Sequence, residues 1–417
     1  MTLENSRATN AIKPSATLEI DALAKKLKAQ GRPVISFAAG EPDFATPSFI
    51  VDAATDAARN PAAQKYTPAA GLPELREAVA LQINQEQKLA SGATFTAEDV
   101  VVTNGGKEAV FLSLAVTLDP GDEVLIACPA WLTYQELIAY FGAKCVEVLG
   151  AQECSYKVSV AQLEANCTTK TKLLILNSPS NPTGAIYSED ELREIGEWCR
   201  LKGIWVIADE IYEYLIYSDV LKRRQEKGFD TAPHILETVP ELRENVIIIN
   251  GVAKSSAMTG WRIGWLAGPE KIVRNAKKLK SHLSSNTNNI GQFAALEALN
   301  AYNSGRKVEL HKMRDQFAKR AELIYALLSE ITAFDVIKPQ GAFYAFVNVS
   351  RALNTPLGSS QVVAESAQEL AMILLNEINV AVVPMDAFGI EDHIRLSYAL
   401  GEDDLTEGIG RMKRFIG

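Results

Sequence analysis

Short apolar runs alternate with longer segments of helical periodicity through the middle of the chain, and this alternation constrains the fold more than any other feature. Six runs have the length and the Val, Ile and Leu content of buried strands: 100–103, 123–127, 173–176, 205–208, 246–249 and 263–267. Strands that alternate with helices predict an α/β fold with a mostly parallel central sheet. We expect the last run, 263–267, to return into the sheet in the opposite direction.

Polar residues follow several of these runs at the point where each strand should end. Asn104-Gly105-Gly106 follows the first run, the turn-rich segment 177–184 follows the third, Asp209 follows the fourth and Lys254 follows the fifth. In open α/β sheets, ligands bind beyond the carboxyl ends of the strands. These loops therefore predict one small-molecule site at that edge of the sheet.

The C-terminal part has a different pattern, which predicts a second, smaller α+β domain. A long helical segment over 307–331 precedes short candidate strands at 342–347, 380–383 and 393–397, which alternate with helices. The N-terminal segment to about residue 44 is expected to pack with this part. We therefore expect three regions: 1–45 with the small domain, 46–300 as the large domain and 301–417 as the small domain.

Composition and charge favour a globular protein that acts on small molecules. The chain has 417 residues, 47% hydrophobic and 22% charged, too many for one small core. With 42 Lys and Arg against 51 Asp and Glu, the net charge of −9 argues against nucleic acid or an anionic membrane as the main partner. The sequence has no apolar run of membrane-spanning length and no secretory leader pattern, so a cytoplasmic location is expected.

Cysteine and histidine give no sign of a metal site. Five cysteines, an odd number without CxxC spacing, indicate reduced, mostly structural thiols. The four histidines lie far apart and have no acidic or cysteine partner at ligand spacing, so each is expected on the surface or in the core. No metal is predicted, and another residue type must move protons if the protein is an enzyme.

Seven segments together resemble the fold-type I, pyridoxal-phosphate-dependent aminotransferases of class I and II: KPSAT from Lys13, AAGEPDF from Ala38, YTPAAGLPELR from Tyr66, NSPSNPTG from Asn177, ADEIY from Ala208, VAKSSAMTGWRIG from Val252 and IRLSYA from Ile394. Their order and spacing cover the whole chain. Within the family they are similar to aspartate aminotransferases of the bacterial type, some of whose relatives accept prephenate. The resemblance implies pyridoxal 5'-phosphate as cofactor and a homodimer with shared active sites.

This resemblance implies catalytic roles for Lys254 and Asp209. A lone loop lysine is usually a solvated charge, but a Schiff base needs a primary amine, and small residues around Lys254 would let a cofactor approach the backbone. The resemblance makes Lys254 the internal aldimine and the proton shuttle. Asp209, which could otherwise simply cap the next segment, is placed at the pyridine nitrogen, whose proton makes the ring an electron sink.

The resemblance assigns the other cofactor contacts residue by residue. Tyr212 and Asn181 are expected at the phenolic oxygen; read alone, they are a half-buried aromatic and a turn former. Trp131, more often a core residue on sequence alone, is expected to stack on the pyridine. The phosphate contacts are expected from the helix start at Gly105, Gly106 and Lys107, from Arg262, and from Tyr66 of the neighbouring subunit.

Further residues are expected at the amino-acid substrate, beside Trp131 and Asn181. Arg395 matches the clamp for the α-carboxylate, and Gly40 would add a backbone contact where a side chain would collide. Lys107 and Thr17 match positions that meet a distal carboxylate in bacterial-type enzymes. Without the resemblance, Lys107 would be interpreted as a solvated charge and Thr17 as a residue that caps or packs the first helix. The lack of arginine over 281–289 favours the substrate role for both residues.

Two departures from the family pattern bear on the pocket. Gly251-Val252-Ala253 precedes the lysine where some relatives carry a hydroxyl residue, so a phosphate contact is lacking there. Met385 stands where relatives often have glycine, at the expected rim of the pocket.

The favoured function is ping-pong transamination from aspartate or glutamate to 2-oxoglutarate or oxaloacetate. Three alternatives stay open at this point. The donor could be alanine, methionine or an aromatic amino acid, or prephenate could be a substrate. The protein could be a pyridoxal-phosphate-dependent lyase on the same fold. A non-catalytic sensing domain is disfavoured, because Lys254, Asp209 and Arg262 occur together and no helix-turn-helix segment is attached.

Overall fold

The computed structural model describes residues 6–14, 16–89 and 92–417, and its centre is a seven-stranded sheet. The strand order is β2-β8-β7-β6-β5-β3-β4, and only β8 runs against the others. The prediction of a mostly parallel sheet with a returning strand at 263–267 is therefore confirmed. The strands are β2 Val100–Thr103, β3 Glu123–Cys128, β4 Lys144–Leu149, β5 Thr171–Asn177, β6 Trp205–Asp209, β7 Val246–Gly251 and β8 Gly264–Ala267.

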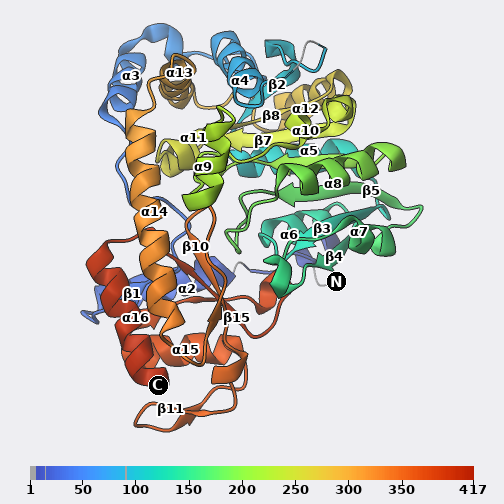
Figure 1. The fold of residues 1–417 in the computed structure, drawn as a ribbon. Coiled ribbons are helices and arrows are strands. Elements are labelled where there is room, and N and C mark those ends of the chain that lie inside the picture. The colour runs from blue at the N-terminus through green and yellow to red at the C-terminus, as the bar shows by residue number, and fades with distance from the viewer. Residues whose placement is uncertain (1–5, 15, 90–91) are drawn as a thin grey trace, which may run out of the picture.

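Both faces of this sheet are buried, as parallel strands require. Alternate residues of one strand point to opposite faces, so Ile207 and Ile247 join one hydrophobic cluster while Val206 and Val246 join the other. Helices α5, α6 and α12 cover the first face and α4, α8, α10 and α13 the second (Figure 1). Their bounds are α4 Pro73–Glu86, α5 Gly106–Thr117, α6 Thr133–Tyr140, α8 Glu189–Lys202, α10 Ile235–Thr238, α12 Glu270–Leu283 and α13 Asn289–Asn303.

The edge strand β4 is the one strand of the large sheet that the apolar pattern does not predict. In Lys144–Leu149 only Val148 is buried, because β4 pairs on one side only, with β3. It carries two charged residues, Lys144 and Glu147, and charged side chains are common on edge strands. The remaining helices around this domain are α3 Ser48–Arg59, α7 Val160–Asn166, α9 Ser218–Glu226 and α11 Val252–Ser255.

The C-terminal part forms a smaller α+β unit around a four-stranded antiparallel sheet of order β14-β15-β10-β9. The expected strand at 380–383 is divided: β13 pairs with the N-terminal β1, and β14 joins the sheet. The elements are β9 Asp335–Val336, β10 Tyr344–Asn348, β11 Pro356–Leu357, β12 Val362–Val363, β13 Val380–Ala381, β14 Val383–Pro384, β15 His393–Ser397, α15 Ala367–Ile378 and α16 Glu402–Ile416.

The N-terminal segment lies mainly against this smaller unit. Helix α2 (Ala16–Ala29) contacts β13 and β14, and β1 (Ile35–Ser36) pairs in parallel with β13. The short α1 (Arg7–Asn10) instead contacts α6 of the large domain, and the Lys13 amide donates to Glu136 at 2.7 Å. The long helix α14 (Val308–Ser329) runs from the large domain to the small one (Figure 1).

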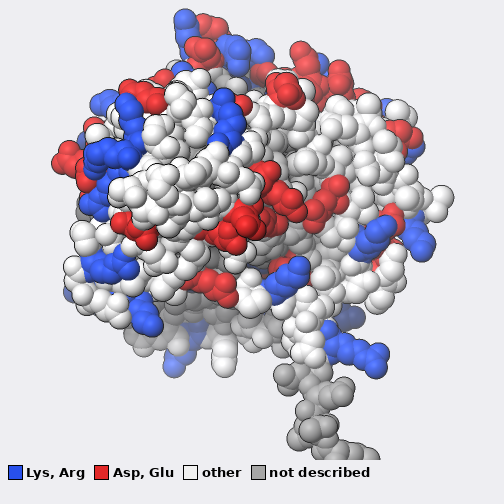
Figure 2. All heavy atoms as spheres, turned by 90° about the horizontal axis from the view of Figure 1, so that it is seen from below, with Lys and Arg blue, Asp and Glu red and all other residues white. Residues whose placement is uncertain are grey.

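Surface charge is mixed on the face that Figure 2 shows. Acidic side chains gather near its middle, whereas Lys and Arg side chains lie mostly toward its edges. Within the described residues, no helix is both long and apolar enough to cross a membrane.

Candidate active site

The predicted site residues gather where β2, β5, β6 and β7 end, at the carboxyl edge of the sheet. Asn177 and Asp209 are paired in register as the last residues of β5 and β6, and the Asn177 amide donates to the Asp209 carbonyl oxygen at 3.0 Å. Helix α5 begins directly after β2, and the short helix α11 after β7 carries Lys254. The strand register thus brings together loops that are far apart in the sequence.

Lys254 faces the segment that links the N-terminal region to the large domain. Its Nζ donates to the Gly40 carbonyl oxygen and lies 5.4 Å from the centre of the Phe343 ring and 5.8 Å from that of Tyr212. Burial of the amine lowers the pKa of Lys254 to about 8, and the positive charges of Arg262 and Arg395 act in the same direction. A lysine with this pKa supplies a neutral amine near physiological pH.

Asp209 is held as a buried carboxylate between two donors. Its side chain accepts a 2.5 Å hydrogen bond from the Tyr134 hydroxyl and a 3.2 Å bond from the Ile211 amide. Burial raises the pKa of Asp209 to about 6, although both donors favour the ionised form. The carboxylate is therefore ionised at neutral pH and suited to face a cation such as a pyridinium.

Arg395 and Asn181 meet from opposite domains. Arg395 is 2% exposed, and its Nη1 donates to Asn181 Oδ1 at 3.0 Å while Nη2 donates to the Ala38 carbonyl oxygen at 3.3 Å. The guanidinium also lies 4.5 Å from the centre of the Tyr344 ring. Its buried Nε has no hydrogen-bond partner within the described residues, so the guanidinium retains donor capacity.

Tyr212 lies in a turn after β6, not in a helix. Its hydroxyl is 3.0 Å from the Tyr344 hydroxyl, and the side chain is buried. In the protein alone, a Cβ at Gly40 would meet only the Tyr344 hydroxyl, at 3.5 Å, so the expected collision at the substrate stays a prediction. The Gly40 carbonyl oxygen accepts a hydrogen bond from Lys254 Nζ.

The start of α5 forms a cradle that only glycine permits. Gly105 has φ of +79°, and a Cβ there would lie 2.4 Å from Nη2 of Arg262. Arg262 donates to the carbonyl oxygens of Thr259 and Asn104, at 2.9 and 3.4 Å. Together with the free amides at the helix start, including that of Gly106, this arrangement suits a phosphate dianion.

Lys107 and Trp131 form the outer part of the site. The Lys107 side chain is exposed, and its Nζ lies 5.0 Å from the centre of the half-buried Trp131 ring. Partial burial of the amine and the nearby Arg262 charge lower the pKa of Lys107. Trp131 packs edge-to-face on Tyr134, with ring centres 5.4 Å apart, and Tyr134 in turn holds Asp209.

The residues present fit pyridoxal 5'-phosphate. Lys254, Arg262 and Arg395 donate these hydrogen bonds to carbonyl or amide oxygens. None of the acceptors in these bonds is a carboxylate, although several cations lie close together. Besides burial, the charge of Arg262 lowers the pKa of both Lys107 and Lys254, and Arg395 also lowers that of Lys254; cations gathered in this way indicate a place for anions. The phosphate and the carboxylates of a substrate would supply them.

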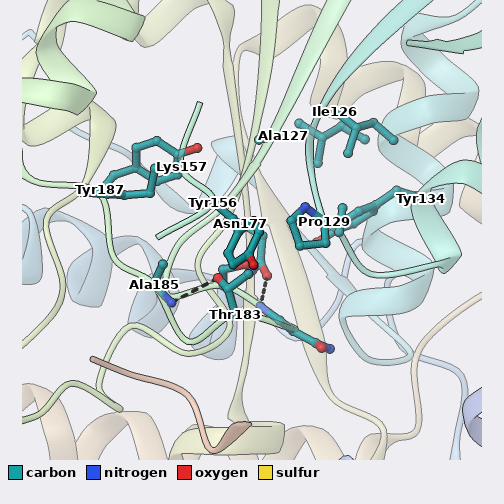
Figure 3. Close-up of a pocket in the computed structure, with 14 residues that line it drawn as sticks. Ile126, Ala127, Pro129, Tyr134, Tyr156, Lys157, Asn177, Thr183, Ala185 and Tyr187 are labelled. Carbon is teal, nitrogen blue, oxygen red and sulfur yellow. Dashed lines mark hydrogen bonds between the residues drawn. The ribbon is translucent and has the colours of Figure 1, made fainter. Parts of the chain in front are cut away.

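A small, partly open cavity lies beside the site. It has a volume of about 20 Å³, roughly the space of one water molecule, and is lined by Tyr134, Asn177, Asn181 and Tyr156 (Figure 3). The backbone amide of Asn181 donates to Asn177 Oδ1 at 2.8 Å and fixes the turn that carries Asn181. Neither Lys254 nor the start of α5 lines this cavity.

Two predicted residues stand apart from this group in the single chain. Tyr66 is 91% exposed, and Thr17 is half-buried in the first turn of α2. Within the described residues, neither side chain hydrogen-bonds to the other predicted site residues. Met385, expected at the pocket rim, is fully buried and packs in a cluster with Ala38 and Phe388.

The structure adds two site residues that sequence reasoning missed. Tyr134 donates to Asp209, and Tyr344 lies against both Tyr212 and Arg395. Tyr134 lies three residues after Trp131, about one helical turn, and this spacing could have indicated Tyr134 as a neighbour of Trp131. Nothing in the local sequence marks Tyr344, which comes from the small domain.

His234 lies in the core, as expected, but the fold brings acidic side chains to it. Its Nδ1 lies 3.1 Å from Glu210 Oε1 and its Nε2 lies 3.7 Å from Glu213 Oε2, and all three side chains are buried. His311 likewise lies 2.6 Å from Asp230. Spacing along the chain could not show these pairs, because the partners come from different elements.

Comparison with known proteins shows to which protein family the chain belongs. The family of class I and II aminotransferases matches residues 32–412, so the chain belongs to this family of fold-type I enzymes, and its cofactor is pyridoxal 5'-phosphate. An aspartate aminotransferase of Streptomyces avermitilis is 46% identical over 99% of this chain and 96% of its own length. An aspartate/prephenate aminotransferase of Cereibacter sphaeroides is 38% identical over 97% and 96%. The structure of Thermus thermophilus aspartate aminotransferase with maleate has a TM-score of 0.89 and 33% identity, covering 99% of this chain and 100% of that one.

Proposed function

We propose that the protein is an aspartate aminotransferase that moves the amino group of aspartate or glutamate to 2-oxoglutarate or oxaloacetate in two half-reactions. The observation that carries this proposal is the convergence of four cations, Lys107, Lys254, Arg262 and Arg395, on the edge of the sheet that holds the buried Asp209. A cofactor phosphate and a dicarboxylic substrate together supply the anions that such a cluster needs. The relatives named aspartate aminotransferase support this donor.

Lys254 is the proposed site of covalent attachment and the proposed base. Pyridoxal phosphate, when bound, draws electrons away from the α-carbon of the substrate. Lys254 Nζ can then take the proton from that carbon, because a pKa near 8 leaves part of the amine neutral at physiological pH. Its bond to the Gly40 carbonyl oxygen directs the amine toward the segment that contacts Arg395.

Asp209 is the proposed partner of the pyridine nitrogen, where it would hold a proton on that atom. Its bond from Tyr134 keeps the carboxylate ionised despite burial, and the Ile211 amide fixes its orientation. Tyr212 and Asn181 would donate to the phenolic oxygen, and Trp131 would cover the ring face. Tyr134 links these roles, since it contacts both Asp209 and Trp131.

Gly105, Gly106, Lys107 and Arg262 are the proposed phosphate contacts. The φ of +79° at Gly105 and its close approach to Arg262 support this role, because a side chain there would fill the cradle. Arg262 would present its planar fork to two phosphate oxygens.

Arg395 is the proposed clamp for the substrate α-carboxylate, with Asn181, Trp131 and the Gly40 backbone beside it. Its bonds to Asn181 and to Ala38 align the guanidinium across the two domains. For the distal carboxylate we propose Lys107 together with Thr17. The amine of Lys107 already lies against Trp131, next to the positive charge of Arg262.

We further propose a homodimer in which each site takes Tyr66 from the partner chain. A tyrosine that is 91% exposed in one chain leaves apolar surface uncovered, and the start of α5 needs further phosphate donors. We also retain the division into regions 1–45, 46–300 and 301–417, and a cytoplasmic location, which suits a protein whose five cysteines are all free thiols.

A second candidate function uses prephenate as the amino acceptor, because a relative named for aspartate and prephenate is 38% identical over nearly the full length. Alanine, methionine and aromatic donors, lyase chemistry and a non-catalytic sensing role are the remaining alternatives. One experiment distinguishes these functions: kcat/KM values are measured for a panel of amino donors with 2-oxoglutarate as acceptor, and prephenate is tested as a second acceptor. Highest efficiency with aspartate or glutamate supports the proposal. Oxo-acid formation without an acceptor would indicate a lyase, and no turnover would indicate a sensor.

A further inference from the structure

Three buried titratable side chains lie directly behind the turn that carries Asp209 and Tyr212. Glu210 and Glu213 belong to this turn and are 5% and 6% exposed, and His234 between them is 1% exposed. The His234 Nδ1 lies 3.1 Å from Glu210 Oε1, and its Nε2 lies 3.7 Å from Glu213 Oε2. The proposed function uses none of these three residues.

Hydrogen bonds from other elements fix the cluster in place. Gln87 Nε2 donates to Glu210 Oε2 at 3.0 Å, and Asn250 Nδ2 donates to Glu213 Oε1 at 2.7 Å. Asn250 also accepts from the Gly251 amide at 2.8 Å, at the end of β7 and just before the helix that carries Lys254. Thr231 Oγ1 lies 3.1 Å from His234 Nε2. The cluster therefore joins the Asp209 turn to the strand that leads to Lys254.

The charges around the cluster make His234 a cation. Burial alone would lower the pKa of His234, but Glu210, Glu213 and Glu237 outweigh it and raise the pKa to about 9. Burial raises the pKa of Glu213 to about 8, although His234 opposes this shift. Within the described residues, Glu210 is thus the carboxylate that the imidazolium balances most directly.

The other charged groups nearby already have partners. Glu237 accepts from Arg224 at 2.7 Å, and Glu86 lies 2.6 Å from Lys307. Neither Arg224 nor Lys307 is thus free to replace His234 beside Glu210.

Glu210 connects this balance to the active site. Its negative charge is one of the causes that raise the pKa of Asp209, after burial. A cation 3.1 Å from Glu210 offsets that effect. We propose that His234 is a positioning residue: its imidazolium neutralises Glu210 and thereby keeps Asp209 ionised at the cofactor's pyridine nitrogen. The inference rests on the proposed role of Asp209.

The test is the pH dependence of cofactor binding, measured as the dissociation constant of pyridoxal 5'-phosphate by equilibrium dialysis of the reconstituted protein. In His234→Gln, the uncompensated Glu210 should raise the pKa of Asp209 by on the order of one unit. Asp209 would then be protonated sooner on acidification, so the loss of binding at low pH should begin about one pH unit higher. Binding at pH 8.5, where Asp209 is ionised in both proteins, should change little.

Two variants distinguish charge balance from packing. Glu210→Gln/His234→Gln removes both charges and should restore the wild-type profile, whereas a packing role predicts that the double variant is worse than either single one. His311→Gln is the matched control, because it also breaks a histidine–carboxylate pair, with Asp230 at 2.6 Å, away from the turn. It should leave the profile unchanged.

A third background separates this inference from the proposed function. Asp209→Asn should weaken cofactor binding, and His234→Gln should cause no further shift in that background because its effect passes through Asp209. If Asp209→Asn binds the cofactor as wild type does, the proposed role of Asp209 is wrong. If Asp209→Asn weakens binding but His234→Gln leaves the profile in place, only the inference about His234 fails. Should His234→Gln not fold, Glu210→Gln alone must move the low-pH limb downward, and an unmoved limb overturns the proposal.

Discussion

Substitution of Lys107 by serine tests the substrate assignment most directly. Lys107 is the second residue of α5, its side chain is exposed, and its Nζ lies 5.0 Å from the centre of the Trp131 ring. Partial burial of the amine and the charge of Arg262 lower the pKa of Lys107, so this cation lies in a place that favours an added anion. The distal carboxylate of aspartate would be that anion.

The exposure of Lys107 sets the size of the expected effect. Removing one partner of a desolvated charge pair costs about 2 to 5 kcal/mol, whereas an exposed pair contributes at most about 1 kcal/mol. We expect the lower end of the first range, since Lys107 is exposed until a substrate and the domains cover it. At about 1.4 kcal/mol per factor of ten, 2 kcal/mol corresponds to roughly 30-fold in kcat/KM for aspartate. A solvated surface lysine predicts no more than about fivefold.

Steady-state kcat/KM values for aspartate, alanine and an aromatic donor give the answer when compared across variants. Lys107→Ser should depress the value for aspartate by about 30-fold and change those for the other donors far less, because they bring no distal carboxylate. The matched control is Lys271→Ser, which removes an exposed lysine 4.5 Å from the centre of Trp205, at the opposite end of β6 from Asp209. Equal losses for all donors in Lys107→Ser would place Lys107 at the phosphate or in the fold and would refute the aspartate assignment.

Four further variants probe the cofactor site. Reduction of the holoenzyme with borohydride should label Lys254, and Lys254→Ala should still bind the cofactor while losing nearly all transamination; a label mapped to another lysine contradicts this assignment. Asp209→Asn should weaken cofactor binding and reduce kcat by orders of magnitude, and a near-wild-type kcat would exclude its role. Gly105→Ala should raise the dissociation constant of the cofactor about tenfold, since φ of +79° costs alanine about 1 to 2 kcal/mol and its Cβ displaces Arg262. Mixing Tyr66→Phe with Lys254→Ala subunits should create hybrid dimers with one intact site, so activity no higher than that of the parents argues against shared sites.

The sequence predicted the large sheet well because its strands are buried on both faces. Residues such as Ile207 and Val206 point to opposite clusters, and such strands appear in the sequence as continuous apolar runs. The edge strand Lys144–Leu149 lacks this signal, since it has one neighbour and a single buried residue. In the small domain, the run 380–383 is one apolar segment that serves two sheets, and only the pairing of β1 with β13 reveals the division.

The sequence could predict only those site residues whose position is fixed by the strand that they end or follow. Lys254, Asp209 and Gly105 follow strands directly, so the end of the strand fixes their position before any long-range contact is known. Tyr134 and His234 act through partners on other elements, and their identity is compatible with an ordinary core position.

A buried carboxylate such as Asp209 makes partners of this kind necessary, because burial alone would favour its neutral form. The strand end can place the carboxylate, but it cannot keep the carboxylate charged. That task requires a donor and a counter-ion from other elements. Tyr134 of α6 donates to Asp209, and His234, just before α10, lies beside Glu210 behind the turn. A sequence motif therefore identifies the acid that we propose for the pyridine nitrogen, whereas its charge state depends on residues that only the tertiary structure brings to it.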